Sequence, residues 1–280
     1  MNIKILSDST CDLSPAQLAE HDIELARLTV IKGGEPFTDG ITITPADIFA
    51  HVAAGGDLCS TTAINIQEYE ELFAKYSADY DAVIHINIGS GFSSCYQNAR
   101  LAAEEFSNVY VIDSQNLSTG QGHVVLEACR LAKTCDNMAE IVEKLNEFTS
   151  RVEASFVLDQ LAYMAKGGRC SAVAALGANL LGLKPCIEVK GGKMGVVKKY
   201  RGSYAKCLSA YVKDRLADRD DIIRNELFLT YTTVADDALQ AVKAGIQEHG
   251  HFATVYETTA GCTVSCHCGP STLGVLFFRK

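Results

Sequence analysis

The sequence lacks the motifs that mark the commonest nucleotide-binding folds. It contains neither a Gly-x-x-x-x-Gly-Lys-Ser/Thr phosphate loop nor the glycine fingerprint of a dinucleotide-binding βαβ unit. It also has no internal repeat, low-complexity tract or long linker. Nucleotide chemistry that depends on these motifs is therefore excluded.

Long apolar runs are missing as well. The N-terminal run Met1–Leu6 is too short for a signal peptide, and Asp8 follows almost at once. The longest stretch without formal charge, Thr258–Phe278, is interrupted by glycines, a proline and several hydroxyl side chains. We interpret it as a loop followed by a buried strand rather than a membrane span. We therefore expect a cytoplasmic protein without stable membrane insertion.

Positive charge is in the minority. The 280 residues include 25 Lys and Arg against 34 Asp and Glu, which gives a net charge of −9. This balance disfavours a general binder of nucleic acid or of anionic membranes, both of which attract basic surfaces. With 48% hydrophobic and 21% charged residues, the chain is long enough for one large globular domain or two modest ones.

Cysteine, by contrast, is abundant, with eleven residues scattered along the chain. In the absence of a signal peptide, we expect reduced thiols at small apolar positions rather than a disulfide framework. The run Cys266-His267-Cys268, with Cys262 close by, suggests a zinc site. However, adjacent residues do not have the paired spacing of zinc ligands, and no second cysteine pair stands at a suitable distance. We therefore expect no metal.

The first half of the chain alternates short β-rich runs with amphipathic helices. Helix starts are indicated by Ser14-Pro15, by Thr44-Pro45 and by Asn65 with Glu68 three residues later, a capping box. The predicted strands are 3–6, 23–31, 81–88 and 109–112. This order predicts an α/β lobe over residues 1–150 with an open, mostly parallel sheet and flanking helices. Ligands of such sheets bind outside the carboxyl ends of the strands.

After residue 150 the pattern changes to a second lobe, 151–280. An almost wholly apolar helix is expected over Ala172–Leu183, and it either belongs to the core or lines a ligand tunnel. The glycines at 191 and 192 indicate a hairpin. The predicted strands are 155–158, 186–190, 194–200, 227–232, 252–256 and 273–278. We therefore expect an α+β lobe with a largely antiparallel sheet and an extensive interface with the first lobe.

Four segments together resemble the DegV family. They are Ser7-Asp8-Ser9-Thr10-Cys11-Asp12-Leu13, Ser60–Asn65, Gly89–Ala99 and Cys266–Gly274. Between them, Gly-Gly-Arg at 167–169 and Tyr-Arg-Gly at 200–202 fall in the expected order, so the resemblance covers one domain of about residues 3–279. It implies a carrier without cofactor or catalysis of its own, which binds a long-chain, palmitate-like fatty acid. It also implies a partner, the ATP-dependent subunit of a bacterial fatty acid kinase.

The resemblance also implies which residues bind the fatty acid carboxylate. They are Thr61, Ser93 and His267, with the neighbouring hydroxyls of Thr62 and Ser94. The chain departs from the family pattern beside each of these positions. The family usually has Thr-Ser-Gln-Pro-Ser at 61–65, Gly-Thr-Tyr at 94–96 and His-Thr-Gly-Pro at 267–270, where this chain has Thr-Thr-Ala-Ile-Asn, Ser-Cys-Tyr and His-Cys-Gly-Pro. The departures concern chain-length preference and head-group geometry rather than ligand class.

The chemistry of these residue types suits a buried carboxylate, which must be hydrogen-bonded. Ser93 stands where a loop enters a helix, so its hydroxyl, backbone N–H groups and the helix dipole can face an anion. Thr61 precedes another predicted helix, and His267, in an uncharged loop with glycine, can donate a further bond. The alternatives are helix capping for the two hydroxyls and a core histidine bonded to backbone.

Two further hypotheses concern catalysis and the docking of a partner. Ser93, Asp113 and His267 follow the Ser…Asp…His chain order of α/β-hydrolases, which would suit a serine esterase or thioesterase. The segment around Ser93, however, lacks the second glycine of the nucleophile elbow. The resemblance places Arg169 and Arg201 near the surface that meets the kinase, whereas an exposed arginine is otherwise a solvated charge.

Overall fold

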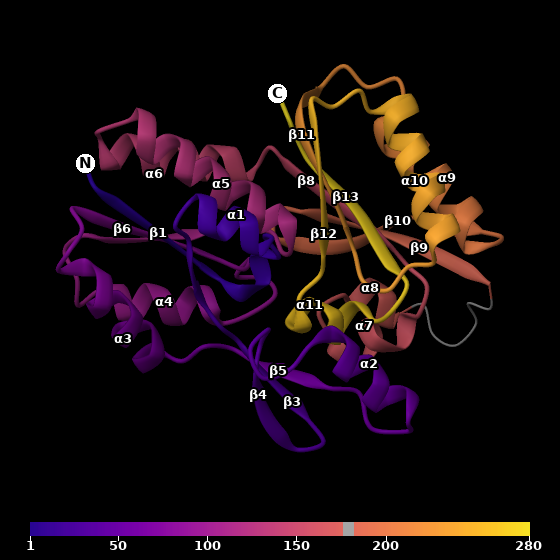
Figure 1. Cartoon of the computed structure of the whole chain (residues 1–280), viewed down its shortest axis with the longest axis horizontal. Helices are drawn as coiled ribbons and strands as arrows, with labels where there is room; N and C mark the ends of the chain where they lie inside the picture. The colour runs from indigo at the N-terminus through magenta and orange to yellow at the C-terminus, as the bar shows by residue number, and fades with distance from the viewer. Residues whose placement is uncertain (176–181) are drawn as a thin grey trace.

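The computed structural model describes residues 1–175 and 182–280. The first sheet along the chain has four strands and is parallel (Figure 1). Its strand order is β2-β1-β6-β7, and every neighbouring pair is parallel. The strands are β1 (Ile3–Asp8), β2 (Glu24–Ala26), β6 (Ala82–Asn87) and β7 (Val109–Asp113). The parallel sheet predicted for the first lobe is thus confirmed.

Helices cover both faces of this sheet, with α3 and α4 on one side and α5 and α6 on the other (Figure 1). The bounds are α1 (Pro15–Glu20), α3 (Ile66–Ser77), α4 (Cys95–Ala103), α5 (Thr119–Thr134) and α6 (Met138–Thr149). The predicted capping box at the start of α3 is confirmed, because Asn65 accepts a bond from the Glu68 N–H and Glu68 accepts one from the Asn65 N–H. Local sequence therefore fixes where this helix begins.

A second, three-stranded antiparallel sheet was not predicted. Its order is β4-β3-β5, with β3 (Thr29–Lys32), β4 (Glu35–Thr38) and β5 (Ser60–Thr62), and α2 (Pro45–Ala53) lies beside it (Figure 1). The prediction of one strand over 23–31 is wrong, because the run is divided between β2 and β3. A continuous apolar run indicates burial but does not say with which strand each part pairs.

The third sheet has six strands in the order β10-β9-β8-β13-β11-β12. All neighbours are antiparallel except β11 and β12, which confirms the largely antiparallel sheet expected after residue 150. The strands are β8 (Val152–Leu158), β9 (Leu183–Lys190), β10 (Lys193–Arg201), β11 (Ile222–Tyr231), β12 (Thr254–Thr259) and β13 (Thr272–Arg279). Whether the two lobes divide at residue 150 as separate domains stays a prediction.

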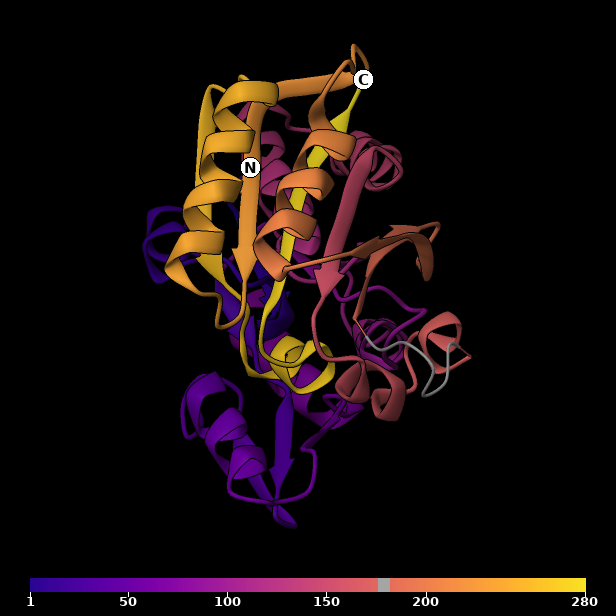
Figure 2. The ribbon, with the colours of Figure 1, turned by 90° about the vertical axis from the view of Figure 1, so that its right-hand side faces the viewer.

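The six-stranded sheet is buried on both faces. Helices α9 (Tyr204–Leu216) and α10 (Asp236–His249) cover its outer face (Figure 2). Its inner face packs against α5, which therefore lies between two sheets and is buried along most of its length. This central position of α5 joins the two halves of the molecule into a continuous core.

Two predicted elements near the C-terminal half are corrected. The apolar helix expected over Ala172–Leu183 is confirmed at its start, where α8 spans Ser171–Ala174, and is wrong at its end, where Leu183 begins β9. Residues 176–181 lie outside the described part of the chain. The loop expected before the last strand instead forms α11 (Cys262–Cys268). The carboxylate of Asp39 accepts bonds from the N–H groups of Cys262 and Thr263, so a distant residue caps this helix.

The cysteines behave as small apolar residues, as expected from the sequence. All eleven are free thiols, and ten are buried. Cys59, Cys262 and Cys266 share a small core with Val30 and Ile48 beneath the three-stranded sheet. Burial raises the pKa of the Cys262 thiol to about 12, which keeps it protonated and unreactive at neutral pH.

Candidate functional site

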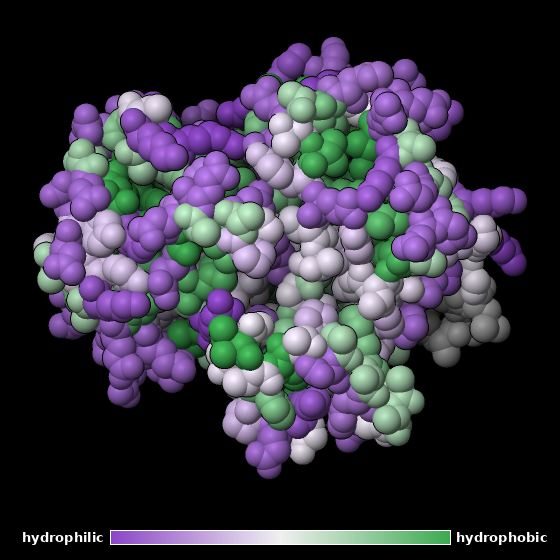
Figure 3. Space-filling view, in the orientation of Figure 1, coloured by the Kyte–Doolittle hydropathy of each residue, from purple (hydrophilic) through white to green (hydrophobic). Residues whose placement is uncertain are grey.

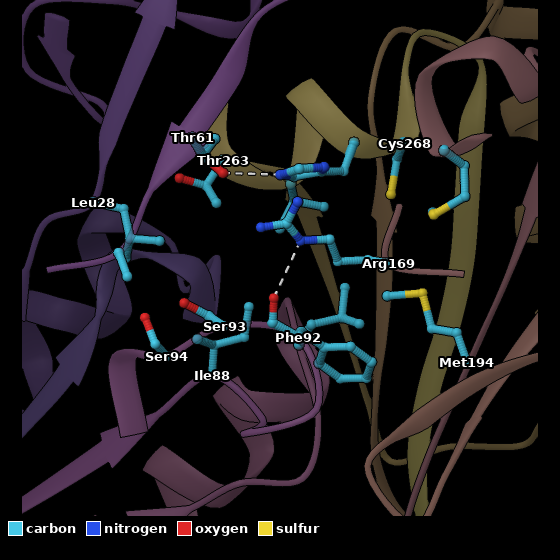
Figure 4. A pocket seen from close by; sticks show the side chains of 15 residues that line it. Leu28, Thr61, Ile88, Phe92, Ser93, Ser94, Arg169, Met194, Thr263 and Cys268 are labelled. Atoms are coloured by element: carbon cyan, nitrogen blue, oxygen red, sulfur yellow. Dashed lines mark hydrogen bonds between the residues drawn. The ribbon is translucent and has the colours of Figure 1, made fainter. Parts of the chain in front are cut away.

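Four segments that are far apart in the sequence meet around one chamber (Figure 4). Strand β5 contributes Thr61, the loop from β6 to α4 contributes Ser93 and Ser94, and α11 contributes His267. Arg169 enters from the loop after α7 (Leu161–Gly167). The chamber contains about 700 Å³ of empty space, part of it open to solvent. Its other lining residues are Leu28, Ala63, Ile88, Phe92, Leu117, Met164, Met194, Thr263, Val264 and Cys268.

Thr61 and His267 are directly joined. The Thr61 Oγ1 and the His267 Nε2 are 2.9 Å apart, and Figure 4 draws this bond as a dashed line. Burial, and then the charge of Arg169, lowers the pKa of His267 to about 4, so the imidazole is neutral at neutral pH. In the tautomer that carries its proton on Nε2, the ring donates to Thr61 and leaves the threonine proton free to donate into the chamber.

The loop before α4 brings Ser93 to the chamber and also caps the helix. Its Oγ accepts a bond from the Cys95 N–H at 3.2 Å, and Cys95 is the first residue of α4. Ser94 lines the chamber too, although its side chain is largely exposed. The first turn of α4 therefore faces the chamber with its positive dipole end. Capping and contact with a bound anion are compatible here, as the sequence allowed.

Arg169 lies in the chamber rather than on a remote surface. Its Nε donates to the Phe92 carbonyl at 3.3 Å, and its Nη1 donates to the Gly167 carbonyl at 2.7 Å. Figure 4 shows the guanidinium between the Thr61 side of the chamber and the Phe92 and Ser93 side. A cation held this way adds positive charge where an anionic head group would stand.

Two of the predicted site residues are not brought to the chamber. Thr62 follows Thr61 on β5, is exposed, and does not line the cavity, because successive strand residues point to opposite faces. Arg201 is exposed at the end of β10 and also lies outside the lining. Contact of Thr62 with a ligand is therefore not supported by the geometry, whereas a role of Arg201 in docking a partner stays a prediction.

The sequence did not predict a second, mostly apolar chamber, which we call the tail chamber. Leu117, Val264 and Cys268 line both chambers, so the two chambers adjoin each other at these residues. The other lining residues of this tail chamber are Ser118, Ala154, Phe156, Val189, Thr230, Tyr231, Thr232, Ala260, Thr272, Gly274 and Leu276. No described residue of the predicted helix 172–183 is among them.

The hydroxyls in the tail chamber already have partners in the protein. Thr230 Oγ1 lies 2.6 Å from Thr119 Oγ1 and 2.9 Å from Thr258 Oγ1. Thr232 donates to the Gly269 carbonyl, and Thr272 donates to the Cys268 carbonyl, both at 2.9 Å. Because these groups are satisfied, their methyl groups and the neighbouring aliphatic side chains define the surface offered to a ligand. The tail chamber thus suits an apolar chain.

The three residues of the esterase hypothesis are not arranged as a triad. Asp113 accepts bonds from the N–H and the hydroxyl of Ser90, at 3.0 and 2.6 Å. His267 is bonded to Thr61, and Ser93 to Cys95. None of these bonds joins two of the three residues, so within residues 1–175 and 182–280 no serine–histidine–aspartate relay links them.

Two properties of the whole described chain bear on function. Across residues 1–175 and 182–280, no three His, Cys, Asp or Glu side chains are grouped so that they could hold a metal ion. In the same ranges, no helix is both long and apolar enough to cross a membrane.

Comparison with known proteins identifies relatives over the full length. The family described as "Uncharacterised protein, DegV family" matches residues 2–280. A DegV domain-containing protein of Clostridium acetobutylicum is 32% identical over 281 residues, which are 99% of each chain. One of Caldanaerobacter subterraneus is 28% identical over 281 residues, again 99% of each.

Solved structures share the fold. A DegV family protein from Thermus thermophilus, described as binding fatty acid, has a TM-score of 0.89 and 25% identity and covers 100% of both chains. DegV from Bacillus subtilis, described as a fatty acid binding protein, has a TM-score of 0.82 and 25% identity with the same coverage. The full-length family match and the Clostridium relative lead to one conclusion: this chain belongs to the DegV family.

Proposed function

We propose that this protein binds one long-chain fatty acid, with its carboxylate in the chamber of Thr61, Ser93 and His267 and its acyl chain in the tail chamber. The observation that carries the proposal is that a polar chamber adjoins an apolar one and shares three lining residues with it. The relatives from Thermus thermophilus and Bacillus subtilis, which are described as fatty acid binding proteins, support the same ligand class.

The polar chamber offers three donors to a carboxylate. These are the Thr61 hydroxyl, supported from behind by His267, the Ser93 hydroxyl, and the guanidinium of Arg169. An unpaired carboxylate removed from water would be very costly, so these bonds fix the orientation of the ligand. A neutral His267 suits this role because it supports the threonine without demanding a full counter-charge.

The acyl chain would supply most of the affinity. About a dozen methylenes at roughly 0.8 kcal/mol each give about 10 kcal/mol of gross transfer free energy, before the costs of association. The hydroxyl groups of the tail chamber are already hydrogen-bonded within the protein, and the rest of its wall is mostly apolar. Displacing water from this wall therefore costs little free energy. The tail would therefore determine affinity, and the head group would determine which end faces the polar chamber.

We further propose that the protein is a cytoplasmic carrier rather than an enzyme. It would present the carboxylate to a fatty acid kinase subunit, which supplies ATP and catalysis, and would hold the acyl phosphate afterwards. Arg169 supports this because an arginine beside the carboxylate can also pair with a phosphoryl group. Arg201, exposed outside the chamber, is the residue that we assign to the kinase-docking surface.

Mass spectrometry of an organic extract tests ligand class directly. Purified protein should release close to one equivalent of a long-chain fatty acid. A matched variant carrying both Thr61→Val and Ser93→Ala should release much less while keeping its melting temperature within a few degrees. Absence of any acyl lipid from the wild type, together with failure of delipidated protein to bind added palmitate, would refute the proposal.

A further inference from the structure

The loop between β6 and α4, which carries Ser93, is held in place by buried hydrogen bonds. The Ile88 N–H donates to the carboxylate of Asp8 at 2.9 Å, and the Gly89 N–H donates to the Asn116 carbonyl at 2.7 Å. Asp8 is itself fully buried, and bonds of this kind are costly to break. At its other end the loop runs directly into α4. Because the backbone is fixed, the main freedom left to Ser93 is the direction of its hydroxyl proton.

Both hydrogen-bonding functions of this hydroxyl are directed at one residue, Cys95. The Ser93 Oγ accepts a bond from the Cys95 N–H at 3.2 Å, and the same hydroxyl donates to the Cys95 Sγ at 3.1 Å. A hydroxyl has only one proton to donate. A fatty acid carboxylate can therefore receive this proton only if the hydroxyl turns away from the sulfur. The bond between Ser93 and the sulfur of Cys95 thus competes with the bond between Ser93 and the ligand.

The sulfur is a weak competitor for the proton. Burial, and then the negative charge of Asp8, raises the pKa of the Cys95 thiol to about 11, so the thiol stays neutral at neutral pH. A neutral sulfur is a weak hydrogen-bond acceptor. A bond to a carboxylate is assisted by charge and is roughly twice as strong as a bond between neutral groups. Exchanging the sulfur for a carboxylate is therefore favourable for the Ser93 hydroxyl.

The surroundings of the thiol leave this sulfur to Ser93. Cys95 is fully buried, and the hydroxyl of Tyr69 on α3, also fully buried, lies beside its thiol. The Tyr69 hydroxyl donates its own proton to Asp8 at 2.7 Å, so it does not donate to the sulfur. In Figure 3, hydrophilic and apolar residues are mixed over α3 and α4, and Cys95 lies beneath that surface. The residue at position 95 therefore decides how firmly the Ser93 proton is held.

We propose that Cys95 is a positioning residue for fatty acid binding, which acts through Ser93 because its sulfur holds the hydroxyl proton only loosely. This inference rests on the proposed function, since it concerns the same carboxylate site. A serine at position 95 would be a stronger acceptor and would hold the proton back from the ligand. An alanine would offer no acceptor and would leave the proton to the ligand. A residue that does not line the chamber thus controls affinity in both directions.

The experiment titrates delipidated wild type, Cys95→Ser and Cys95→Ala with palmitate. Because one neutral hydrogen bond changes affinity only a few-fold, we expect Cys95→Ser to bind about fivefold more weakly and Cys95→Ala about threefold more tightly than the wild type. Beside Ser93→Ala the same two substitutions should have no effect, since the residue through which Cys95 acts is gone. Cys129→Ser is the matched control at a buried thiol that lines neither chamber, and it should bind as the wild type does.

Weaker binding in both Cys95 variants, or the same change with and without the Ser93 hydroxyl, would show that Cys95 acts through packing, and the inference would be wrong. Equal affinity in the wild type and both variants would also overturn it. If Cys95→Ser does not fold, Cys95→Ala still decides, because its tighter binding must disappear beside Ser93→Ala. Failure of the wild type to bind palmitate would refute the proposed function itself, so the two failures are distinguishable.

Discussion

Thr61 and His267 are 206 residues apart in the sequence, yet the threonine Oγ1 and the histidine Nε2 lie within 2.9 Å of each other. Strand β5 carries the first residue and the last turn of α11 carries the second. The bond thus links the small antiparallel sheet to the helix that precedes the last strand. A head-group site built in this way depends on the packing of α11, and not only on the residues that touch a ligand.

Loss of either hydroxyl in the polar chamber should weaken ligand retention. Thr61→Val and Ser93→Ala each remove one bond to a buried carboxylate, a loss of about 1–3 kcal/mol, which corresponds to roughly fivefold to a hundredfold or more in affinity. Titration of delipidated protein with palmitate measures the effect. Thr62→Val is the matched control, because Thr62 is exposed and lies outside the chamber lining, and it should bind as the wild type does. Equal affinity in all three variants would contradict the assignment.

Gly167 should be required for the position of His267. A Cβ atom at this position would lie 2.5 Å from the His267 Nδ1, closer than van der Waals contact allows, so Gly167→Ala should displace the ring from Thr61. We expect at least a tenfold loss of palmitate affinity. The control is Gly195→Ala, where an added Cβ meets nothing within 4 Å and the backbone is not left-handed. If the two alanine variants bind palmitate equally well, the ring is free to move and the prediction is wrong.

Some features of the fold could be predicted from the sequence because their causes are local. The capping boxes at Thr44 and Asn65 involve residues three positions apart, and the structure contains both. Helix α11 could not be predicted in this way, since the bonds that cap it come from Asp39, more than two hundred residues earlier. Threonine, valine and cysteine have only modest helix propensity, so tertiary contacts decide whether this segment is helical.

The tail chamber could not be predicted from the sequence for a related reason. Strand β13 is buried on both faces, so Leu273, Val275 and Phe277 face α9 and α10 while Gly274 and Leu276 face the chamber. A strand buried on both sides has no alternation of apolar and polar residues from which the ligand face could be identified. The proposed head-group residues come from the family resemblance, and the geometry then places Thr61 in the chamber lining and Thr62 outside it.

Acid should destabilise the ligand-free protein through His267. The unfolded histidine has its ordinary pKa of 6.5, whereas burial and Arg169 lower the folded value to about 4. Between these values the unfolded chain binds more protons, so the free energy of unfolding falls as the pH drops from 6.5 to 4, by up to about 3 kcal/mol. His267→Gln should remove this loss in denaturant titrations, and the exposed His251→Gln should not. An unchanged pH profile in His267→Gln would contradict the prediction.

Asp12 should act in the opposite direction. Burial raises its pKa from 3.8 to about 7, so between these values the folded state holds a proton that the unfolded chain releases. The free energy of unfolding should therefore rise as the pH falls from 7 toward 4, and this gain partly offsets the loss at His267. Asp12→Asn should remove the gain and make acid destabilisation steeper in the same titrations. The exposed Asp57→Asn serves as control, and a steeper profile in both variants would show that the effect is not specific to Asp12.

The last prediction separates ligand binding from transfer to the kinase. Arg201 is exposed and outside the chamber, so Arg201→Ala should retain fatty acid fully and slow acyl-phosphate formation by weakening encounter with the kinase. Raising the salt concentration should shrink the difference from wild type, because exposed charges are screened. Arg169 lines the chamber, so Arg169→Ala should lose activity even at saturating kinase, with a smaller loss of bound lipid.

The measurement pairs quantified extracted lipid with ATP-dependent acyl-phosphate formation over a range of kinase concentrations. Arg201→Ala should approach the wild-type maximum as kinase increases, whereas Arg169→Ala should not, because its defect lies where the phosphoryl group arrives. Lys243→Ala, which removes a positive charge from α10, controls for a general effect of lower positive charge. If Arg201→Ala loses lipid in proportion to activity, it is a structural or ligand-side residue and not a docking residue. If added kinase fully rescues Arg169→Ala, its guanidinium serves encounter rather than the transfer itself.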